Sequence, residues 1–245
     1  MKCKLCLNEK LLIKQSHIIP DFMYKELYDE KHFIHQISLG DTAKPKSKPT
    51  GEYESNILCE RCDNKIINQG YEDYASKVYY GSEKDTSIKH RRERSKNSVL
   101  EWTIVKNISY EKFKLFLLSL LWKSSISSRA FFQHVRLGPH EEIIRKMIIN
   151  SDPKEQHDYP CILLHAKHQG LDIKELITPP NRFKDGKSTI YKFFISGIFY
   201  LYYVPTGREP EFLFEGAINK SNTMKIFHFP EDRTNQSLLK KMLLN

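Results

Sequence analysis

Two pairs of cysteines are the residues of this chain whose type and spacing most directly indicate chemistry. Each pair has the spacing C-x-x-C, and together they supply four thiols: Cys3 and Cys6 in CKLC, Cys59 and Cys62 in LCERC. Four thiolates are the ligand number and ligand type of a structural, tetrahedral zinc site. A thioredoxin-like redox motif or chance clustering are the alternatives, but one redox motif would explain only one pair. We therefore predict one structural zinc ion held by these four cysteines.

A histidine lies between the two cysteine pairs, His17 in the segment QSHIIP. Neutral imidazole has an unperturbed pKa of about 6.5 and can therefore take a proton from water at physiological pH. Hydrolysis of a phosphodiester needs such a base, together with a divalent cation that stabilises charge on the phosphate. A histidine at the end of a strand is also commonly a hydrogen-bonded structural residue, so His17 alone leaves both interpretations open.

The segments around these residues predict the elements that position them. LLIKQSHII is typical of a strand that ends at Pro20, and DFMYKELYDE of a short helix. HFIHQISLG predicts a second strand, and residues 41–54 an exposed loop. From Cys59 onward the apolar residues have helical spacing, so the second cysteine pair should begin a helix. The 52 residues between Cys6 and Cys59 exceed the spacing of a zinc ribbon, which implies an inserted substructure.

In this order the elements resemble the zinc-containing HNH, or ββα-metal, endonucleases, which have a treble-clef zinc module. Members of that family commonly show C-x-x-C, a strand with Asp-His-Ile-x-Pro, and a helix that begins Leu-Cys-x-x-Cys-Asn. The corresponding segments here are CKLC, SHIIP and LCERCDN. The similarity covers roughly residues 1–80, and it is closer still to uncharacterised bacterial HNH-like proteins that carry Ser-His-Ile-Ile-Pro.

The resemblance implies a role for His17 as the general base of a nuclease. It places the family's metal ligand at the helix start on Asp63, while Asn64 could serve if the helix register shifts by one residue. Mg²⁺ or Mn²⁺ would accept either side-chain oxygen and would prefer the carboxylate. Because the zinc ion would draw the strand against the helix, we expect His17 close to Asp63 and facing a groove.

Three positions depart from the family pattern. The residue before the base is usually an aspartate that also binds the catalytic metal, but here it is Ser16. Glu72, further along the predicted helix, is a candidate for a second metal-binding carboxylate. The family's central asparagine falls on Glu54, and Asn56, two residues later, is the candidate for that catalytic position.

A basic, polar stretch follows the predicted zinc module. Its segment KHRRER could contact phosphates through its basic side chains Lys89, His90, Arg91, Arg92 and Arg94, or it could be a solvated linker. We place the domain boundary in residues 82–98, which gives an HNH-like domain at 1–98 and a second domain at 99–245 that recognises substrate or partner. The formal charge of +9 also favours a polyanionic partner.

The second domain is predicted to be α+β. LEWTIV predicts a strand, SYEKFKLFLLSLLWKSSIS a helix so apolar that it should be buried, and GPHEEIIRKMII another helix. Short aromatic and β-branched runs then predict a mostly antiparallel sheet: YPCILLHA, STIYKFFIS, GIFYLYYV, EFLFEGAI and MKIFHF. We expect a hairpin across Ser196 and Gly197, a buried Cys161 and a final helix in NQSLLKKMLL.

These features support three hypotheses. The first is a metal-dependent endonuclease, with structural zinc and catalytic Mg²⁺ or Mn²⁺. The second is a non-catalytic nucleic-acid-binding or assembly protein, which Ser16 favours. The third is an interaction protein whose zinc is purely structural. The expected partner is nucleic acid, DNA before RNA, with a partner protein or a second copy docking on the C-terminal domain. A defence role is compatible with the resemblance but is not contained in these residues.

The longest strongly apolar run, LFLLSLLW at residues 115–122, is shorter than the ~20 residues that a membrane span needs. A membrane is therefore not an expected partner, and we expect a cytoplasmic protein.

Overall fold

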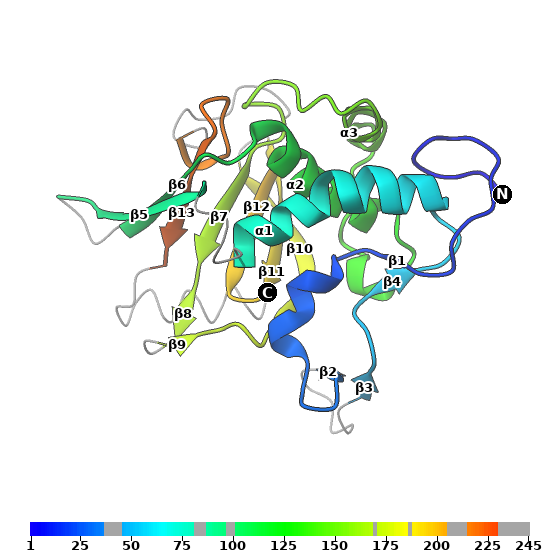
Figure 1. The fold of residues 1–245 in the computed structure, drawn as a ribbon, viewed down its shortest axis with the longest axis horizontal. Helices are drawn as coiled ribbons and strands as arrows, with labels where there is room; N and C mark the ends of the chain where they lie inside the picture. The colour runs from blue at the N-terminus through cyan, green and yellow to red at the C-terminus, as the bar shows by residue number, and fades with distance from the viewer. Residues whose placement is uncertain are drawn as a thin grey trace.

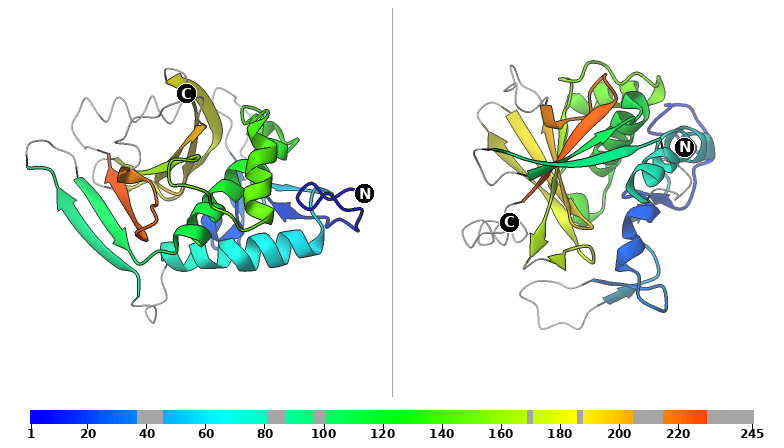
Figure 2. Two further views of the ribbon diagram at one scale, coloured as in Figure 1. Left: turned by 90° about the horizontal axis from the view of Figure 1, so that it is seen from above. Right: turned by 60° about the vertical axis from the view of Figure 1, so that its left-hand side comes forward.

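A computed structural model describes residues 1–36, 46–80, 87–96, 101–168, 171–185, 188–204 and 215–229. A seven-stranded sheet carries the helices on one side (Figure 1 and Figure 2). In spatial order its strands are β10 (Ile177–Asp185), β11 (Ser188–Ile195), β12 (Ile198–Val204), β7 (Cys161–His165), β13 (Thr223–His228), β6 (Glu101–Lys106) and β5 (Lys89–Arg94). All neighbours are antiparallel except β13 and β7, so this mixed α/β structure has a mostly antiparallel sheet.

The long helix α2 (Tyr110–Ile126) forms the centre of the molecule. Its apolar side chains point in every direction, so they can leave water only if other elements surround the helix. The sheet lies on one side of it, and the N-terminal helices and α3 (His140–Ile149) lie on the others (Figure 2). Almost every residue of α2 is buried, which confirms the prediction of a buried central helix.

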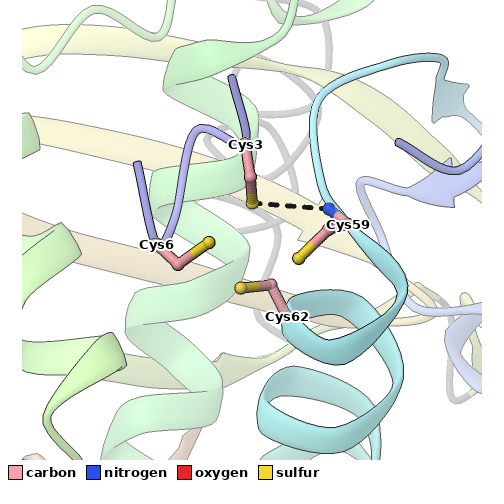
Figure 3. A group of neighbouring side chains, drawn as sticks. All are labelled: Cys3, Cys6, Cys59 and Cys62. Atoms are coloured by element: carbon pink, nitrogen blue, oxygen red, sulfur yellow. Dashed lines mark hydrogen bonds between the residues drawn. The ribbon is translucent and has the colours of Figure 1, made fainter. Parts of the chain in front are cut away.

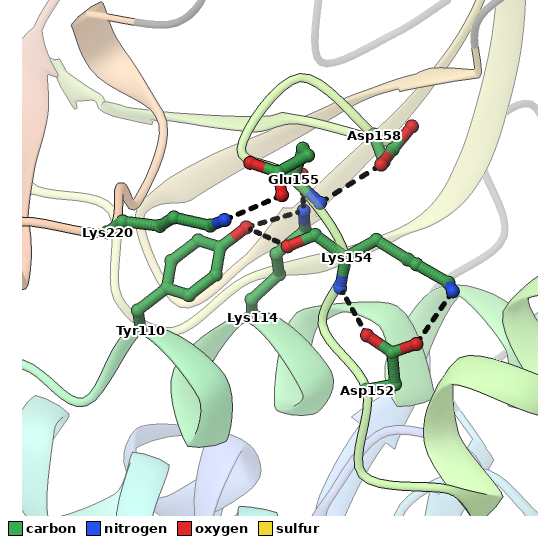
Figure 4. Close-up of polar contacts among 7 residues, drawn as sticks. All are labelled: Tyr110, Lys114, Asp152, Lys154, Glu155, Asp158 and Lys220. Carbon is green, nitrogen blue, oxygen red and sulfur yellow. Dashed lines mark hydrogen bonds and ion pairs between the residues drawn. The ribbon is translucent and has the colours of Figure 1, made fainter.

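The start of α2 is attached to the loop that precedes β7 (Figure 4). Lys114, which is almost fully buried, contacts the hydroxyl of Tyr110 at 3.0 Å and the backbone carbonyl of Glu155. Tyr110 in turn donates its hydroxyl proton to the carbonyl of Lys154 at 2.9 Å. Burial lowers the pKa of Lys114 to about 8, although nearby carboxylates act in the opposite direction. These contacts fix the end of α2 that lies away from the cysteines.

The N-terminal segment contains short strands followed by one long helix. Strand β1 (Ser16–His17) pairs antiparallel with β4 (Tyr53–Glu54), and the predicted strand over 11–19 is therefore reduced to two residues. Between them lie a 3₁₀ helix, a second antiparallel pair and connecting turns: η1 (Asp21–Leu27), β2 (Ile34–Gln36) and β3 (Lys46–Lys48). After the second cysteine pair the chain forms η2 (Arg61–Glu72), wound as a π-helix, which continues into α1 (Asp73–Tyr80).

Short elements also follow α2 and β7. They are η3 (Ala130–Phe132) after α2, and the antiparallel pair β8 (Lys167–His168) and β9 (Leu171–Asp172) after β7.

Two strands differ from the sequence-based expectation. KHRRER is β5, an edge strand paired along its length with β6, so it is not a linker, although most of its side chains are exposed to solvent. Strand β10 was not predicted, because Pro179 and Pro180 are turn signals. It is the opposite edge of the sheet, and its register shifts between Thr178 and Asn181, where the prolines can be accommodated.

Other local predictions have mixed outcomes. The loop expected at 41–54 contains β3 and β4, and its residues 41–45 lie outside the described part. A strand was expected in EFLFEGAI. Residues 211–214 of this segment lie outside the described residues, and Glu215 and Gly216 are helical. The helix expected in NQSLLKKMLL falls wholly outside the described residues.

The turn between β11 and β12 confirms the predicted hairpin. Ile195 pairs with Ile198, and the two residues between them have positive φ, 47° for Ser196 and 85° for Gly197. Positive φ at both central positions is the type I′ geometry that matches the twist of a hairpin. Ser196 also donates its hydroxyl proton to the carbonyl of Met23 in η1 at 2.8 Å, so the tip of the hairpin contacts the N-terminal segment.

Buried contacts connect the two predicted domains. The largest cluster of buried side chains contains residues from both, including Ile67 of η2 and Phe116 of α2. Tyr71 donates its hydroxyl proton to the carbonyl of Ile148 at 2.8 Å, and Lys4 bonds to the carbonyl of Ile126 at 2.9 Å. Within the described ranges, no helix is long and apolar enough to cross a membrane.

Candidate metal centre and the His17 site

The four predicted cysteines lie together in space (Figure 3). Their sulfur atoms all lie within 4.8 Å of one another, and all four thiols are free. Zinc–sulfur bonds of about 2.3 Å in a tetrahedron imply sulfur–sulfur separations of about 3.8 Å, which this arrangement allows. The four thiols could therefore hold a metal ion such as zinc. Cys161 is buried in β7, apart from this cluster, as expected.

Backbone hydrogen bonds hold the two cysteine pairs in place. The amide of Cys59 donates to the sulfur of Cys3 at 3.4 Å. Burial acts to raise the pKa of Cys3, but hydrogen bonds from backbone amides, including those of Cys6 and Cys59, lower it to about 7. Ile13 also bonds to the carbonyl of Leu58 at 2.9 Å. The segment that leads to His17 is therefore attached to the segment that leads into η2.

The two positions that the family resemblance assigns to the catalytic metal touch each other. Ser16, which is 0% exposed, donates its hydroxyl proton to Oδ1 of Asp63 at 2.5 Å. A cation bound between them would have to break this bond. Asp63 still has its second carboxylate oxygen, and Asn64 follows it on the half-buried side of the helix.

His17 points away from this contact, because successive side chains of a strand face opposite sides. Its Nε2 lies 2.9 Å from the hydroxyl oxygen of Thr50, and its ring is half-buried. Within the described part of the chain, Nδ1 makes no hydrogen bond. Asp63 is thus contacted by Ser16, the neighbour of His17. The strand β1 lies against the start of the helix, as expected, but the hydrogen bond to Asp63 comes from Ser16 and not from His17.

Glu72 is held by an ion pair. Its carboxylate lies 2.6 Å from the ammonium of Lys123, and the two side chains are only 12% and 2% exposed. The same ammonium donates to the backbone carbonyl of His17 at 2.7 Å. Glu72 therefore compensates a buried charge and anchors β1, and a metal at this carboxylate would leave Lys123 without its partner. Sequence reasoning missed Lys123, although a lysine inside the apolar run of α2 was a visible signal.

The residues around the central asparagine position have structural contacts. Asn56 is exposed with a φ of 60°, and its backbone amide bonds to the carbonyl of Ile13 at 3.0 Å. Glu54 accepts hydrogen bonds from the hydroxyls of Ser127 and Ser128, each at 2.7 Å. Burial acts to raise the pKa of Glu54, but these hydrogen bonds lower it below its usual value. Glu54 thereby ties β4 to the chain just after α2.

The basic strand β5 is partly neutralised by acidic neighbours. Arg91 pairs with Glu93, Arg92 with Glu101, and Arg94 approaches Glu101 at 3.9 Å. Lys89 and His90 are exposed, and neither forms a salt bridge with the residues that the structure describes. All five basic side chains remain at the surface of the outermost strand.

Comparison with known proteins gives no match: no family model, no curated protein and no solved structure is similar to this chain. The resemblance to HNH endonucleases therefore depends on the sequence motifs alone.

Proposed function

We propose that this protein is a zinc-stabilised, metal-dependent endonuclease of the HNH type, with His17 as its general base. The observation that supports it most is the order and pairing of the N-terminal elements. Strand β1 with His17 pairs antiparallel with β4, and both lead to a helix that begins at the four-cysteine cluster. This is the strand, strand and helix order of the family that the motifs resemble.

The proposed mechanism divides the chemistry among few side chains. The contact between Nε2 and Thr50 orients the imidazole of His17 and leaves Nδ1 to accept the proton of an attacking water. Asp63 would bind Mg²⁺ or Mn²⁺ through its second oxygen, with Asn64 as an alternative ligand. Mg²⁺ keeps several waters and often uses one or two carboxylates plus substrate phosphates, so one carboxylate is sufficient. The cation would stabilise charge on the phosphate, while the basic side chains of β5, at the other end of the molecule, would bind a distant part of a long nucleic acid (Figure 1).

A non-catalytic nucleic-acid-binding or assembly protein is the second candidate. The hydrogen bond between Ser16 and Asp63 favours it, because it satisfies both side chains without a cation. The zinc module and β5 would then bind nucleic acid without cutting it.

Cleavage assays distinguish the two candidates. Wild type, His17→Ala and the control His134→Ala, an exposed histidine that follows η3, would be incubated with plasmid, single-stranded DNA and RNA, with and without Mg²⁺ or Mn²⁺. We expect metal-dependent cleavage that falls by ~10²–10⁴-fold in His17→Ala only, with zinc content and affinity unchanged. Binding without cleavage by wild type would select the second candidate, and undiminished cleavage by His17→Ala would refute His17 as the base.

A further inference from the structure

A pocket of about 220 Å³ lies beside His17, and none of the roles assigned above uses it. Its wall includes Thr50, whose hydroxyl contacts the imidazole of His17 at 2.9 Å. One side of the pocket comes from η1 and the β2–β3 pair. The other side comes from Phe131 of η3 and from the start of β10. The pocket therefore lies where the candidate base meets the second half of the chain.

The walls of this pocket are mainly rings and aliphatic side chains, with a few polar groups. Tyr24, Phe131 and Ile177 supply apolar surface, and Gln36, Thr50 and Glu175 supply hydrogen-bonding groups. Gln36 and Glu175 make no side-chain hydrogen bond or ion pair within the described ranges, so both groups can bond to a ligand. Such a combination, apolar walls with a few polar groups that set orientation, is typical of small-ligand sites.

The Tyr24 wall is fixed before any ligand binds. The hydroxyl of Tyr24 accepts a hydrogen bond from the amide of Glu52 at 2.9 Å, and the residue is almost fully buried. Its ring lies so close to Gly51 that a Cβ at that position would come within 2.2 Å of the ring. Only glycine allows this approach, so this wall of the pocket is in place before a ligand arrives.

Size, charge and position indicate the occupant. The pocket is smaller than the ~300–1,000 Å³ of sites for drug-sized ligands, so it suits a single ring system. Lys48 in the pocket wall is paired with Glu52 at 2.6 Å, so it adds no free charge there, whereas the chain as a whole carries a formal charge of +9, which favours an anionic polymer. A ligand that brings a phosphate to His17 and a planar ring to this pocket is a nucleotide within a strand.

We propose that this pocket binds one unpaired nucleobase, so that the substrate class is single-stranded nucleic acid or a flipped-out base. The inference deepens the proposed function, and it rests on it for the position of the phosphate. A base in a duplex is stacked on both faces and could enter only after unstacking, which costs free energy. Hydrogen bonds from Gln36 and Glu175 would favour some bases over others. Stacking on the aromatic rings of the pocket wall would be possible for any base.

The test measures binding without added divalent cation, so that affinity does not depend on cleavage. Fluorescent single-stranded DNA and RNA of one sequence, their duplexes and a single strand with abasic sites would be titrated with wild type and variants. Wild type should prefer the single strand over both the duplex and the abasic strand by about 10-fold. Phe131→Ala should lose about 10-fold in affinity for the intact strand, and Phe183→Ala, an exposed aromatic of β10 outside the pocket, should lose nothing.

Gln36→Ala is a second variant, at an exposed residue whose change does not endanger folding. It should change the order of affinities among homopolymers of the four bases while the melting temperature stays constant. Equal binding of duplex and single strand, or full affinity in Phe131→Ala together with an unchanged order of affinities in Gln36→Ala, would overturn the base pocket. In that case the nuclease proposal would still stand if wild type cuts nucleic acid and His17→Ala does not. Single-strand preference without any cleavage would refute the nuclease and keep the pocket, and no binding at all would refute both.

Discussion

At the scale of single residues, the contact between Ser16 and Asp63 decides how a divalent cation could bind. The serine hydroxyl is a donor in this contact and occupies one carboxylate oxygen at 2.5 Å. An aspartate at the same buried position would put two carboxylates side by side, and their repulsion would raise the pKa of one of them unless a cation neutralised both. Ser16 thus offers Asp63 a hydrogen-bond proton at the place where an aspartate would need a cation.

Introducing an aspartate at position 16 should therefore create a stronger metal site. Without metal, we expect Ser16→Asp to melt at a lower temperature than wild type. Addition of Mn²⁺ should raise the melting temperature of Ser16→Asp by more than it raises that of wild type. A ligand at 100 times its Kd stabilises the folded state by about 2.7 kcal/mol. Thermal melting with and without Mn²⁺ measures the gain, and Ser16→Asn is the neutral control of similar size. Equal Mn²⁺ shifts in all three proteins would contradict a cation site at Asp63.

At the scale of elements, the parallel pair β7 and β13 brings two histidines together. Nδ1 of His165 lies 3.4 Å from Nδ1 of His228, and Nε2 of His228 lies 2.8 Å from the hydroxyl of Thr103 on β6. Burial, with smaller contributions from His165, Arg92 and Lys167, lowers the pKa of His228 to about 4, and Glu101 acts in the opposite direction. The junction of these three strands therefore favours a neutral imidazole.

This pKa predicts loss of stability in acid. Between about pH 6.5 and pH 4 the unfolded chain binds a proton at residue 228 that the folded chain does not, so the free energy of unfolding falls as pH decreases through this range. His228→Gln should remove part of that dependence, because glutamine keeps polar contacts and does not titrate. Urea unfolding at pH 7.5 and pH 5 measures the change, with His134→Gln as control. The same loss between the two pH values in wild type and His228→Gln would exclude this histidine as the cause.

At the scale of the whole molecule, the four-cysteine cluster should stabilise both halves of the chain. Metal binding in small zinc modules contributes ~10 kcal/mol or more to folding, and here the module shares a buried core with α2. We expect Cys59→Ser to lose the metal and to lower the melting temperature reported by Trp102 and Trp122, which both lie in the predicted second domain, residues 99–245. Cys161→Ser, at a buried cysteine outside the cluster, should retain the metal.

The measurements are metal content by mass spectrometry and thermal unfolding followed by tryptophan fluorescence. An unchanged tryptophan transition in metal-free Cys59→Ser would mean that residues 99–245 fold independently, as the sequence-based domain boundary implies. A single transition shifted to lower temperature would mean that contacts such as the ion pair of Lys123 with Glu72 make the two halves one cooperative unit.

Sequence reasoning succeeded where the signal was local. The cysteine spacing predicted the cluster, the apolar helix predicted the buried α2, and the turn at Ser196 and Gly197 predicted a hairpin. It failed where contact with another segment decides the structure. KHRRER is a strand because β6 pairs with it, and the motifs placed the strand of His17 near Asp63 without indicating that Ser16 donates a hydrogen bond to this carboxylate.

The row of basic residues on β5 also bears on how this protein behaves at high concentration. An edge strand has unpaired backbone groups that can recruit the edge of another chain, and this leads to aggregation. Within the described ranges no other strand pairs with the outer edge of β5. Two such edges could pair only by bringing their lysine and arginine side chains together, so the charges of KHRRER oppose this pairing whether or not they ever meet a phosphate.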